Sequence, residues 1–284
     1  PGPKTFERVF PVLGFQHMRR NVSNFDVVHI HGIWRMLLLM GAVLSDIRGV
    51  RYVIAPRGMM DPWSMAQKRV KKALAWHLLW KRIIDGAFFL HALNSDEKDL
   101  IQPLGVRCPI NVIPNGVFCE QSGFGIDGGT ISEKFPFLAG REYVLFLSRL
   151  HYKKGIDLLI EAFGKIPSDD CTVELVIAGP DEGMREQLEA LAPRLQTGPR
   201  VHFLGPLYGD AKYAALRGAA CFCLPSRQEG FSMAVLEALS VGTPVVASEA
   251  CHFPEIEAAG AGYIVRPTPD DIARGLSAIL SSHH

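Results

Sequence analysis

Short runs of apolar residues alternate with amphipathic stretches along nearly the whole chain. Runs of this length and composition are typical of strands that are buried on both faces of a parallel sheet. The predicted strands cover residues 26–30, 52–55, 87–93, 111–113, 143–148, 173–178, 201–204, 220–224, 244–247 and 263–265.

The stretches between these strands follow the helical period instead. One apolar stripe recurs with i, i+3, i+4, i+7 spacing, and a second, with i, i+4, i+7, i+11 spacing, starts 28 residues after it. The first stripe consists of Ile156, Leu159, Ile160 and Phe163, and the second of Met184, Leu188, Leu191 and Leu195. Strands that alternate with helices form βαβ units, so the pattern predicts an α/β fold with doubly wound parallel sheets.

The alternation breaks once, in a glycine-rich stretch over residues 119–140. We interpret this stretch as the connection between an N-terminal domain (1–138) and a C-terminal domain (139–284). Residues 123–128 match the letters of the dinucleotide-binding G-x-G-x-x-G. That loop functions directly after a strand and at the start of a helix, a context that is missing here, so the match does not predict a dinucleotide site.

Composition excludes several classes of protein. Of the 284 residues, 48% are hydrophobic and 21% are charged, which allows a sizeable core and excludes global disorder. The net charge of +1 argues against a strongly basic nucleic-acid-binding protein. The charge is unevenly divided: residues 1–138 hold 17 Lys and Arg against 11 Asp and Glu, and residues 139–284 hold 13 against 18. Two lobes with different partners have this pattern, as do two solvated surfaces.

The cysteines and the hydropathy favour a cytoplasmic protein. Six cysteines without a C-x-x-C pair do not make a disulfide scaffold, and Cys221 and Cys223 stand in an apolar run, where we expect small buried side chains. No apolar run approaches the roughly 20 residues of a membrane-spanning helix. No signal peptide opens the sequence.

The first stretch with candidate chemistry covers residues 148–157. A predicted strand ends at Ser148, a short cationic turn follows, and a helix starts near Gly155. Ligands of open α/β sheets bind outside the carboxyl ends of strands, where Arg149 and Lys154 are suited to hold phosphate oxygens. A solvated basic turn is the alternative.

The second stretch covers residues 226–238 and also follows a strand. A helix is predicted from about Ser232 to Val241, and its first N–H groups are suited to receive a phosphate. Glu229 precedes this helix and Glu237 lies inside it, about 8–12 Å away at 1.5 Å per residue. Glu229 as a helix-start carboxylate and Glu237 as a satisfied buried acid form the alternative. However, an acid within so apolar a helix is uncommon without a partner.

Together these stretches resemble the retaining GT-B glycosyltransferases of family 4. The resemblance lies in the pairing of Ser-Arg-Leu-x-x-x-Lys-Gly-x-Asp with Glu-Gly-Phe-Ser-x-x-x-x-Glu, and in the Gly-Thr-Pro-Val-Val-Ala that follows. Residues 26–32, 55–63 and 112–117 agree with it. It implies two Rossmann-like domains that face across a cleft. It also implies transfer of a sugar from a nucleotide-diphosphate donor with retained anomeric configuration.

The resemblance also implies roles for particular residues. Arg149 and Lys154 match the cations that hold the diphosphate, and Glu229 and Glu237 match the contacts to the donor hexose and ribose. His31 matches a position that faces the reacting sugar, although a histidine at a strand end is more often structural. The implied donor-binding residues are Gly230, Phe231, Ser232, Met233 and Glu237. Preorganised cations stabilise the charge of the departing diphosphate, so we expect no metal and no cofactor. Consistently, the chain has no D-x-D pair.

Two features of the family have no counterpart here. Nothing like its opening strand and glycine-rich loop precedes Asp26, and no closing helix that returns to the first domain follows Leu280. The resemblance therefore predicts a chain that is truncated at both ends, with an incomplete first domain.

Residues 68–84 hold six cations, two tryptophans and no acid. On a helix, Ala73, Trp76, Leu79, Trp80, Ile83 and Ile84 share one face. Such a helix either covers the sheet with its apolar face or lies on an anionic membrane, with a peripheral location at the inner membrane face. On the acceptor side, the loop over residues 56–63 offers Arg57 and Asp61.

We therefore expect a metal-independent hexosyltransferase that uses a nucleotide-diphosphate sugar and a glycan or lipid-linked acceptor in polysaccharide biosynthesis. It should bind no nucleic acid. A non-catalytic GT-B fragment or accessory binding subunit is the second hypothesis. An NAD(P)-dependent oxidoreductase is the third, although the chain lacks a correctly placed glycine fingerprint for it.

Overall fold

The chain consists of two compact units in a computed structural model that describes residues 12–117, 131–166, 173–195 and 200–281. The units are Pro1–Asn115 and Gly116–His284. Ile131 and Leu138 belong to the hydrophobic core of the second unit, so the division falls earlier in the chain than the predicted boundary at residue 138. The glycine motif at 123–128 lies outside the described residues.

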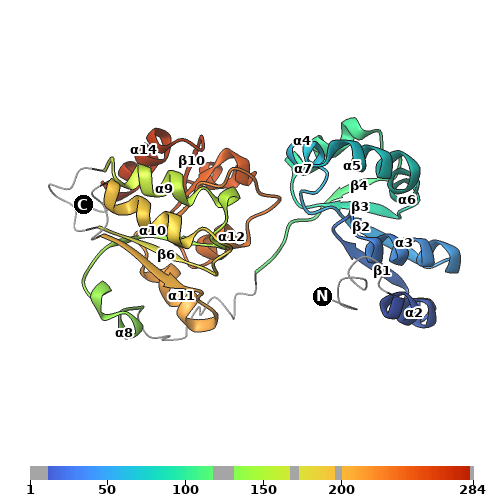
Figure 1. Cartoon of the computed structure of the whole chain (residues 1–284), viewed down its shortest axis with the longest axis horizontal. Helices are drawn as coiled ribbons and strands as arrows, with labels where there is room; N and C mark the ends of the chain where they lie inside the picture. The colour runs from blue at the N-terminus through green and yellow to red at the C-terminus, as the bar shows by residue number, and fades with distance from the viewer. Residues whose placement is uncertain (1–11, 118–130, 167–172, 196–199, 282–284) are drawn as a thin grey trace. The chain divides into compact units, whose positions relative to one another are not determined.

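The first unit is built on a four-stranded parallel sheet in the order β1-β2-β3-β4 (Figure 1). Its strands are β1 (Val27–His31), β2 (Arg51–Ala55), β3 (Phe89–Ala92) and β4 (Ile110–Val112). Its helices are α2 (Val12–Asn21), α3 (Met36–Arg48), α4 (Pro62–Ala66), α5 (Arg69–Ala75), α6 (Lys81–Asp85) and α7 (Ser95–Ile101). A π-helical turn, Trp76–Trp80, joins α5 to α6.

The second unit has a six-stranded parallel sheet in the order β10-β9-β8-β5-β6-β7. Its strands are β5 (Tyr143–Leu147), β6 (Glu174–Ala178), β7 (Val201–Gly205), β8 (Cys221–Leu224), β9 (Val245–Ser248) and β10 (Gly262–Val265). Its helices are α8 (Ile131–Lys134), α9 (Ile156–Phe163), α10 (Arg185–Arg194), α11 (Gly209–Gly218), α12 (Met233–Ser240), α13 (Glu255–Ala258) and α14 (Pro269–Leu280).

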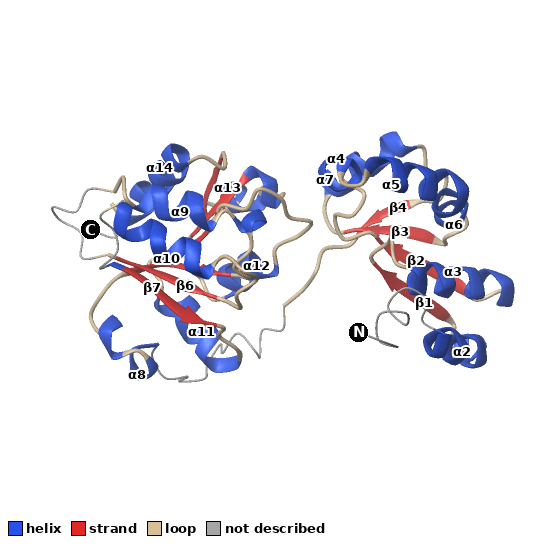
Figure 2. Cartoon of the chain, viewed as in Figure 1, coloured by secondary structure: helices blue, strands red, loops and turns tan. Residues whose placement is uncertain are grey.

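The central strands of the second unit are buried on both faces. Every residue of β6, β8 and β9 is buried, and Figure 2 shows α9 and α10 on one side of the sheet and α11 on the other. Burial on both sides explains why these strands are continuous apolar runs. All ten predicted strands are confirmed, with ends that differ by one or two residues.

The helical stripes differ in how far they are buried. The stripe of α9 is fully buried, as predicted, whereas only Leu188 of the predicted α10 stripe is buried. Cys221 and Cys223 are buried free thiols, as predicted, and so are Cys108 and Cys251. Burial raises the pKa of the Cys108 thiol to about 11 and those of Cys221 and Cys251 to about 12.

The segment from α5 to α6 covers the sheet of the first unit. Trp76, Trp80 and Ile84 are buried in its core. Leu79 and Ala73, predicted on the same face, are exposed, which corrects that part of the prediction. The π-helical turn accounts for the exposure of Leu79, because it holds more residues per turn than the α-helix on which the predicted face was drawn.

Candidate functional site

Two loops of the second unit meet at the carboxyl edge of its sheet. Strands β5 and β8 are parallel neighbours, so the loops that follow them leave the sheet at the same edge. Gly155, at the end of the first loop, has φ +67°, and a Cβ there would lie 2.1 Å from the carbonyl oxygen of Pro225 in the second loop. Only glycine permits this approach, which holds the two sequence motifs together.

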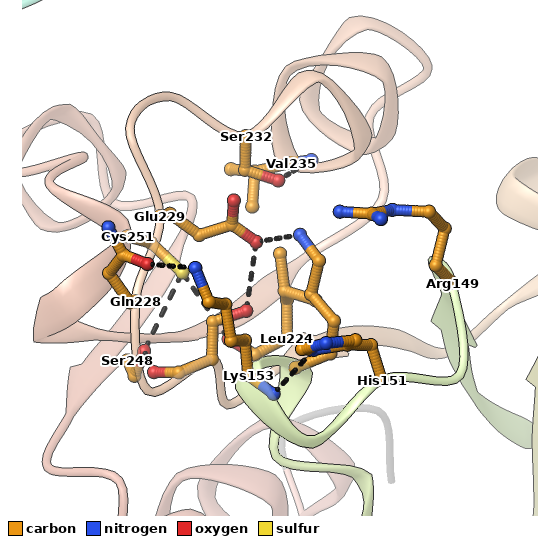
Figure 3. A network of polar contacts seen from close by, with 12 residues as sticks. Arg149, His151, Lys153, Leu224, Gln228, Glu229, Ser232, Val235, Ser248 and Cys251 are labelled. Atoms are coloured by element: carbon orange, nitrogen blue, oxygen red, sulfur yellow. Dashed lines mark hydrogen bonds and ion pairs between the residues drawn. The ribbon is translucent and has the colours of Figure 1, made fainter. Parts of the chain in front are cut away.

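The centre of this edge is an ion pair between Lys154 and Glu229, which joins the two loops (Figure 3). Both side chains are nearly buried, with exposed fractions of 13% and 10%. The Ser226 hydroxyl donates to the same Glu229 oxygen over 2.9 Å, and next to it Lys153 donates to Gln228 over 2.7 Å. The sequence-predicted Lys154 and Glu229 are thus direct partners.

Arg149 lies at the rim of the same edge. Its side chain is 56% exposed and donates to both carboxylate oxygens of Glu182, over 2.8 and 2.9 Å. In Figure 3 its guanidinium points toward the space between Glu229 and Ser232. Because surface ion pairs contribute little, Arg149 can leave Glu182 for another anion at little cost.

Helix α12 starts directly over this space. Ser232 is its N-cap residue and its hydroxyl accepts from the N–H of Val235 over 3.3 Å. Among the described residues, the N–H groups of Ser232 and Met233 make no hydrogen bond, as expected for the first turn of a helix. Glu237, one to two turns into α12, pairs with Lys212 of α11 over 2.8 Å. Its partner therefore comes from a helix that the sequence analysis did not connect with it.

These groups line one cavity of about 370 Å³. Of the predicted site residues, the lining contains Arg149, Lys154, Glu229, Phe231, Ser232, Met233 and Glu237, whereas Gly230 does not line it. Gly179 and Tyr208 complete the wall from the ends of neighbouring strands. A larger cavity of about 630 Å³ lies at the opposite edge of the sheet, beside Thr243 and Gly262. We favour the smaller cavity because open parallel sheets bind ligands at the carboxyl ends of their strands.

A second polar cluster lies in the first unit, around His31 at the end of β1. Arg57 donates to His31 Nδ1 from Nη2 and Nε, over 2.9 and 3.2 Å, and to Asn115 Oδ1 over 2.6 Å. Partial burial and then the charge of Arg57 lower the pKa of His31. The structure thus brings the predicted Arg57 and His31 into contact.

Two further histidines continue this cluster into the sheet. The His29 ring lies 4.2 Å from that of His31, and His29 Nε2 lies 3.2 Å from His91 Nδ1. The pKa of His29 is lowered to about 4, by partial burial first and then by His31, His91 and Arg57. Asp61, the other predicted acceptor-side residue, is the N-cap of α4 and accepts from the N–H of Ser64 over 2.5 Å.

Sequence analysis missed Ser226, Lys212, Glu97 and Asn115 as parts of these clusters. Glu97 is buried and accepts from the N–H groups of Gly58 and Leu93, over 2.6 and 2.7 Å. A signal for it was present, since Asn94 and Glu97 have the spacing of a capping box. Asn94 does cap α7, but the Glu97 carboxylate reaches the loop after β2 as well.

The described residues contain no group of three or more His, Cys, Asp or Glu side chains arranged to hold a metal ion. Among the same residues, no helix is long and apolar enough to cross a membrane.

The chain is similar to known glycosyltransferases in sequence. It is 39% identical over 141 residues to an uncharacterized glycosyltransferase of Methanocaldococcus jannaschii. That alignment covers 49% of this chain and 35% of the relative. It is 27% identical over 266 residues to the phosphatidyl-myo-inositol mannosyltransferase of Mycobacterium leprae, covering 88% of this chain and 62% of that enzyme. The chain therefore spans about one to two thirds of the length of these relatives.

Solved structures show the same fold. Sucrose-phosphate synthase from Thermosynechococcus elongatus superposes with a TM-score of 0.78 at 19% identity, over 99% of this chain and 71% of that one. Anabaena HepE in complex with UDP and glucose superposes with a TM-score of 0.76 at 22% identity, over 95% of this chain and 72% of that one. Residues 129–283 match the glycosyl transferases group 1 family and residues 1–116 match the glycosyl transferase 4-like domain. The chain therefore belongs to the group 1 glycosyl transferases, of the family 4 type, and has their GT-B fold.

Proposed function

We propose that this chain carries the active site of a retaining glycosyltransferase. In this proposal it moves a hexosyl group from a nucleotide-diphosphate sugar to a glycan or lipid-linked acceptor in polysaccharide biosynthesis. The observation that carries the proposal is the cavity at the carboxyl edge of the second sheet. One nearly buried ion pair, one exposed arginine and the first turn of α12 all border this cavity.

Each group has a proposed task in that cavity. Lys154 and Arg149, together with the N–H groups at the start of α12, bind the diphosphate. Glu229, held by Lys154 and Ser226, accepts hydrogen bonds from sugar hydroxyls, and Glu237 accepts them from the ribose. HepE, which shares the fold, is described in complex with UDP and with UDP-glucose, which supports a donor of this class.

In the proposed reaction the bond between the sugar C1 and the diphosphate oxygen breaks, and the acceptor oxygen bonds to C1 from the same face. The acceptor proton goes to the departing phosphate oxygen. Negative charge grows on the diphosphate as the bond breaks. The cations and helix N–H groups therefore stabilise the transition state more than the bound donor. In this scheme the protein supplies the positive charge itself, and we assign no metal ion or cofactor to it.

A thermal-shift titration with UDP, GDP, ADP and NAD tests the donor site. One diphosphonucleotide at about 100 times its Kd should add roughly 2.7 kcal/mol, a shift of a few degrees. Lys154→Ala should remove the shift, whereas Lys165→Ala, which breaks a surface pair with Asp270, should retain it. No shift with any diphosphonucleotide would contradict the proposal, and a shift with NAD alone would favour an oxidoreductase.

We also propose that α5 and the π-helical turn contact anionic lipid. On the outer side of this segment, an exposed apolar stripe has i, i+4, i+8 spacing. It consists of Val70, Leu74 and Leu78, whose exposed fractions are 82%, 61% and 67%. In the described part of the chain, the side chains of the neighbouring cations make no hydrogen bond or ion pair; these are Lys68, Arg69, Lys71 and Arg82. An exposed apolar stripe flanked by cations is typical of helices that lie on anionic membranes. This surface supports a lipid-linked acceptor and a peripheral membrane location.

A further inference from the structure

The proton position on His31 follows from its contacts with Arg57. A guanidinium has only donors, so the Nδ1 atom of His31 that receives two of them must carry a lone pair. A neutral imidazole with a lone pair on Nδ1 carries its proton on Nε2. His31 is therefore a hydrogen-bond donor through Nε2, and protonation at Nδ1 would break both contacts with Arg57.

The position of Arg57 is defined by its backbone conformation and by two hydrogen bonds. Its backbone has φ +57°, a strained conformation for a residue with a side chain. The next N–H, of Gly58, donates to the buried Glu97, and the Arg57 guanidinium also donates to Asn115. Glu97 and Asn115 come from α7 and from the segment after β4. Groups from separate parts of the first unit therefore hold the guanidinium against His31.

The other titratable groups near His31 act in the same direction. The carbonyl oxygen of Ile113 only accepts, so His91 Nε2 donates to it over 2.6 Å, and His91 Nδ1 lies 3.2 Å from His29 Nε2. His91, like Arg57, lowers the pKa of His31. A proton added to His31 would place a positive charge beside Arg57, the nearest cation.

We propose that Glu97, Arg57 and Asn115 are positioning residues that hold His31 as a neutral hydrogen-bond donor at Nε2. This inference rests on the proposed function and on the family resemblance, in which the position of His31 faces the reacting sugar. It assigns His31 the task of donating to a sugar oxygen and excludes it as the base that takes the acceptor proton. That agrees with the proposed transfer of the acceptor proton to the leaving phosphate.

Nitrogen-15 NMR of the histidine rings tests the inference without substrate. The wild-type protein should show His31 as the Nε2–H tautomer at neutral pH. In Arg57→Gln the Nδ1–H tautomer should appear and the pKa of His31 should rise. Arg51→Gln, which removes an exposed cation stacked on Phe88, should change neither and is the matched control. An Nδ1–H tautomer in the wild type, or an unchanged His31 in Arg57→Gln, would overturn the inference.

Kinetics separate this inference from the proposed function. Arg57→Gln should lower kcat by up to about 100-fold through misplacement of His31, with donor Kd unchanged. The acid limb of its pH profile should move to higher pH, and Arg57→Lys should restore part of the loss. If the tautomer is as inferred but no nucleotide binds, the proposed function fails and the role of Arg57 in holding His31 stands. Glu97→Gln should change the His31 tautomer in the same direction, and if this variant does not fold, Arg57→Gln still decides the outcome.

Discussion

The polar clusters of the two units differ in how many segments of the chain contribute to them. In the second unit, the central contact joins two loops that are each a continuous motif, and Lys154 and Glu229 neutralise each other. In the first unit, His31, Arg57, Glu97 and Asn115 come from four separate segments, and His31 is neutral. A site carried by two motifs can be found in a sequence, whereas a site assembled from four segments becomes visible only in the fold.

The surfaces of the units differ as well. Residues 1–115 hold 16 Lys and Arg against 8 Asp and Glu, and residues 116–284 hold 14 against 21. Of the large hydrophobic side chains exposed in the described residues, 15 lie in the first unit and 5 in the second. A basic surface with exposed apolar side chains suits an anionic amphiphile. The comparison is consistent with the proposal that the first unit binds the acceptor and the second the donor, and four predictions test it.

The largest effect is expected at the donor cavity. Lys154→Ala should lower transfer by about 100- to 1,000-fold, because it removes a charge proposed to stabilise the departing diphosphate. Glu229→Gln, which keeps the shape of the side chain, should have a similar effect. Release of diphosphonucleotide from a panel of donor sugars measures the rate, and circular dichroism checks the fold. Full activity in both folded variants would refute the site, and Lys165→Ala should remain fully active.

The next effect concerns the contact that joins the two motifs. Gly155→Ala should destabilise the protein by about 3 kcal/mol, since a Cβ would overlap the Pro225 carbonyl in addition to the strain of the positive φ. Gly140→Ala is the matched control: its φ is +69° with open space around it, and about 1 kcal/mol is expected. Urea unfolding followed by circular dichroism measures both. An equal loss of unfolding free energy in the two variants would show that the close approach to Pro225 does not contribute to the destabilisation.

A smaller effect is expected on membrane binding. Replacing Leu74 and Leu78 by serine should weaken sedimentation with phosphatidylglycerol-containing vesicles by about 10- to 100-fold, because two apolar side chains no longer enter the interface. Ile47→Ser, at an exposed position of α3, should bind like the wild type. Added salt or pure phosphatidylcholine should weaken the wild type, since the cations need anionic lipid. If the double serine variant binds vesicles as the wild type does, α5 and the π-helical turn are not the membrane contact.

The smallest effect is a dependence of stability on pH. His29 has a pKa of about 4 in the folded chain, against about 6.5 when unfolded. Below pH 6.5 the unfolded chain takes up a proton that the folded chain does not, so stability is complete above pH 6.5 and falls between 6.5 and about 4. His29 is only partly buried, so solvent screening keeps the effect small. His29→Asn should flatten the curve of melting temperature against pH, and the exposed His77→Asn should not.

The outcome at individual residues shows how far sequence reaches. The strands were predictable because burial on both faces demands continuous apolar runs. Lys154 and Glu229 were predictable as candidate site residues because each stands in a strand-to-helix loop. Lys212 was not predictable, since its contact with Glu237 depends on how α11 packs beside α12. The exposure of Leu78 and Leu79 was not predicted, because both lie in the π-helical turn, which changes the rotation that a regular helix would give.

The burial of the thiols gives each unit its own reporter of opening. Alkylating reagents need a thiolate and physical access, and burial denies both to Cys108 in the first unit and to Cys221, Cys223 and Cys251 in the second. All four tryptophans belong to the first unit. Once Cys119 and Cys171 are replaced by serine, tryptophan emission follows the first unit and residue-resolved alkylation follows both. The order in which the two sheets open can thus be timed in one polypeptide without an attached label.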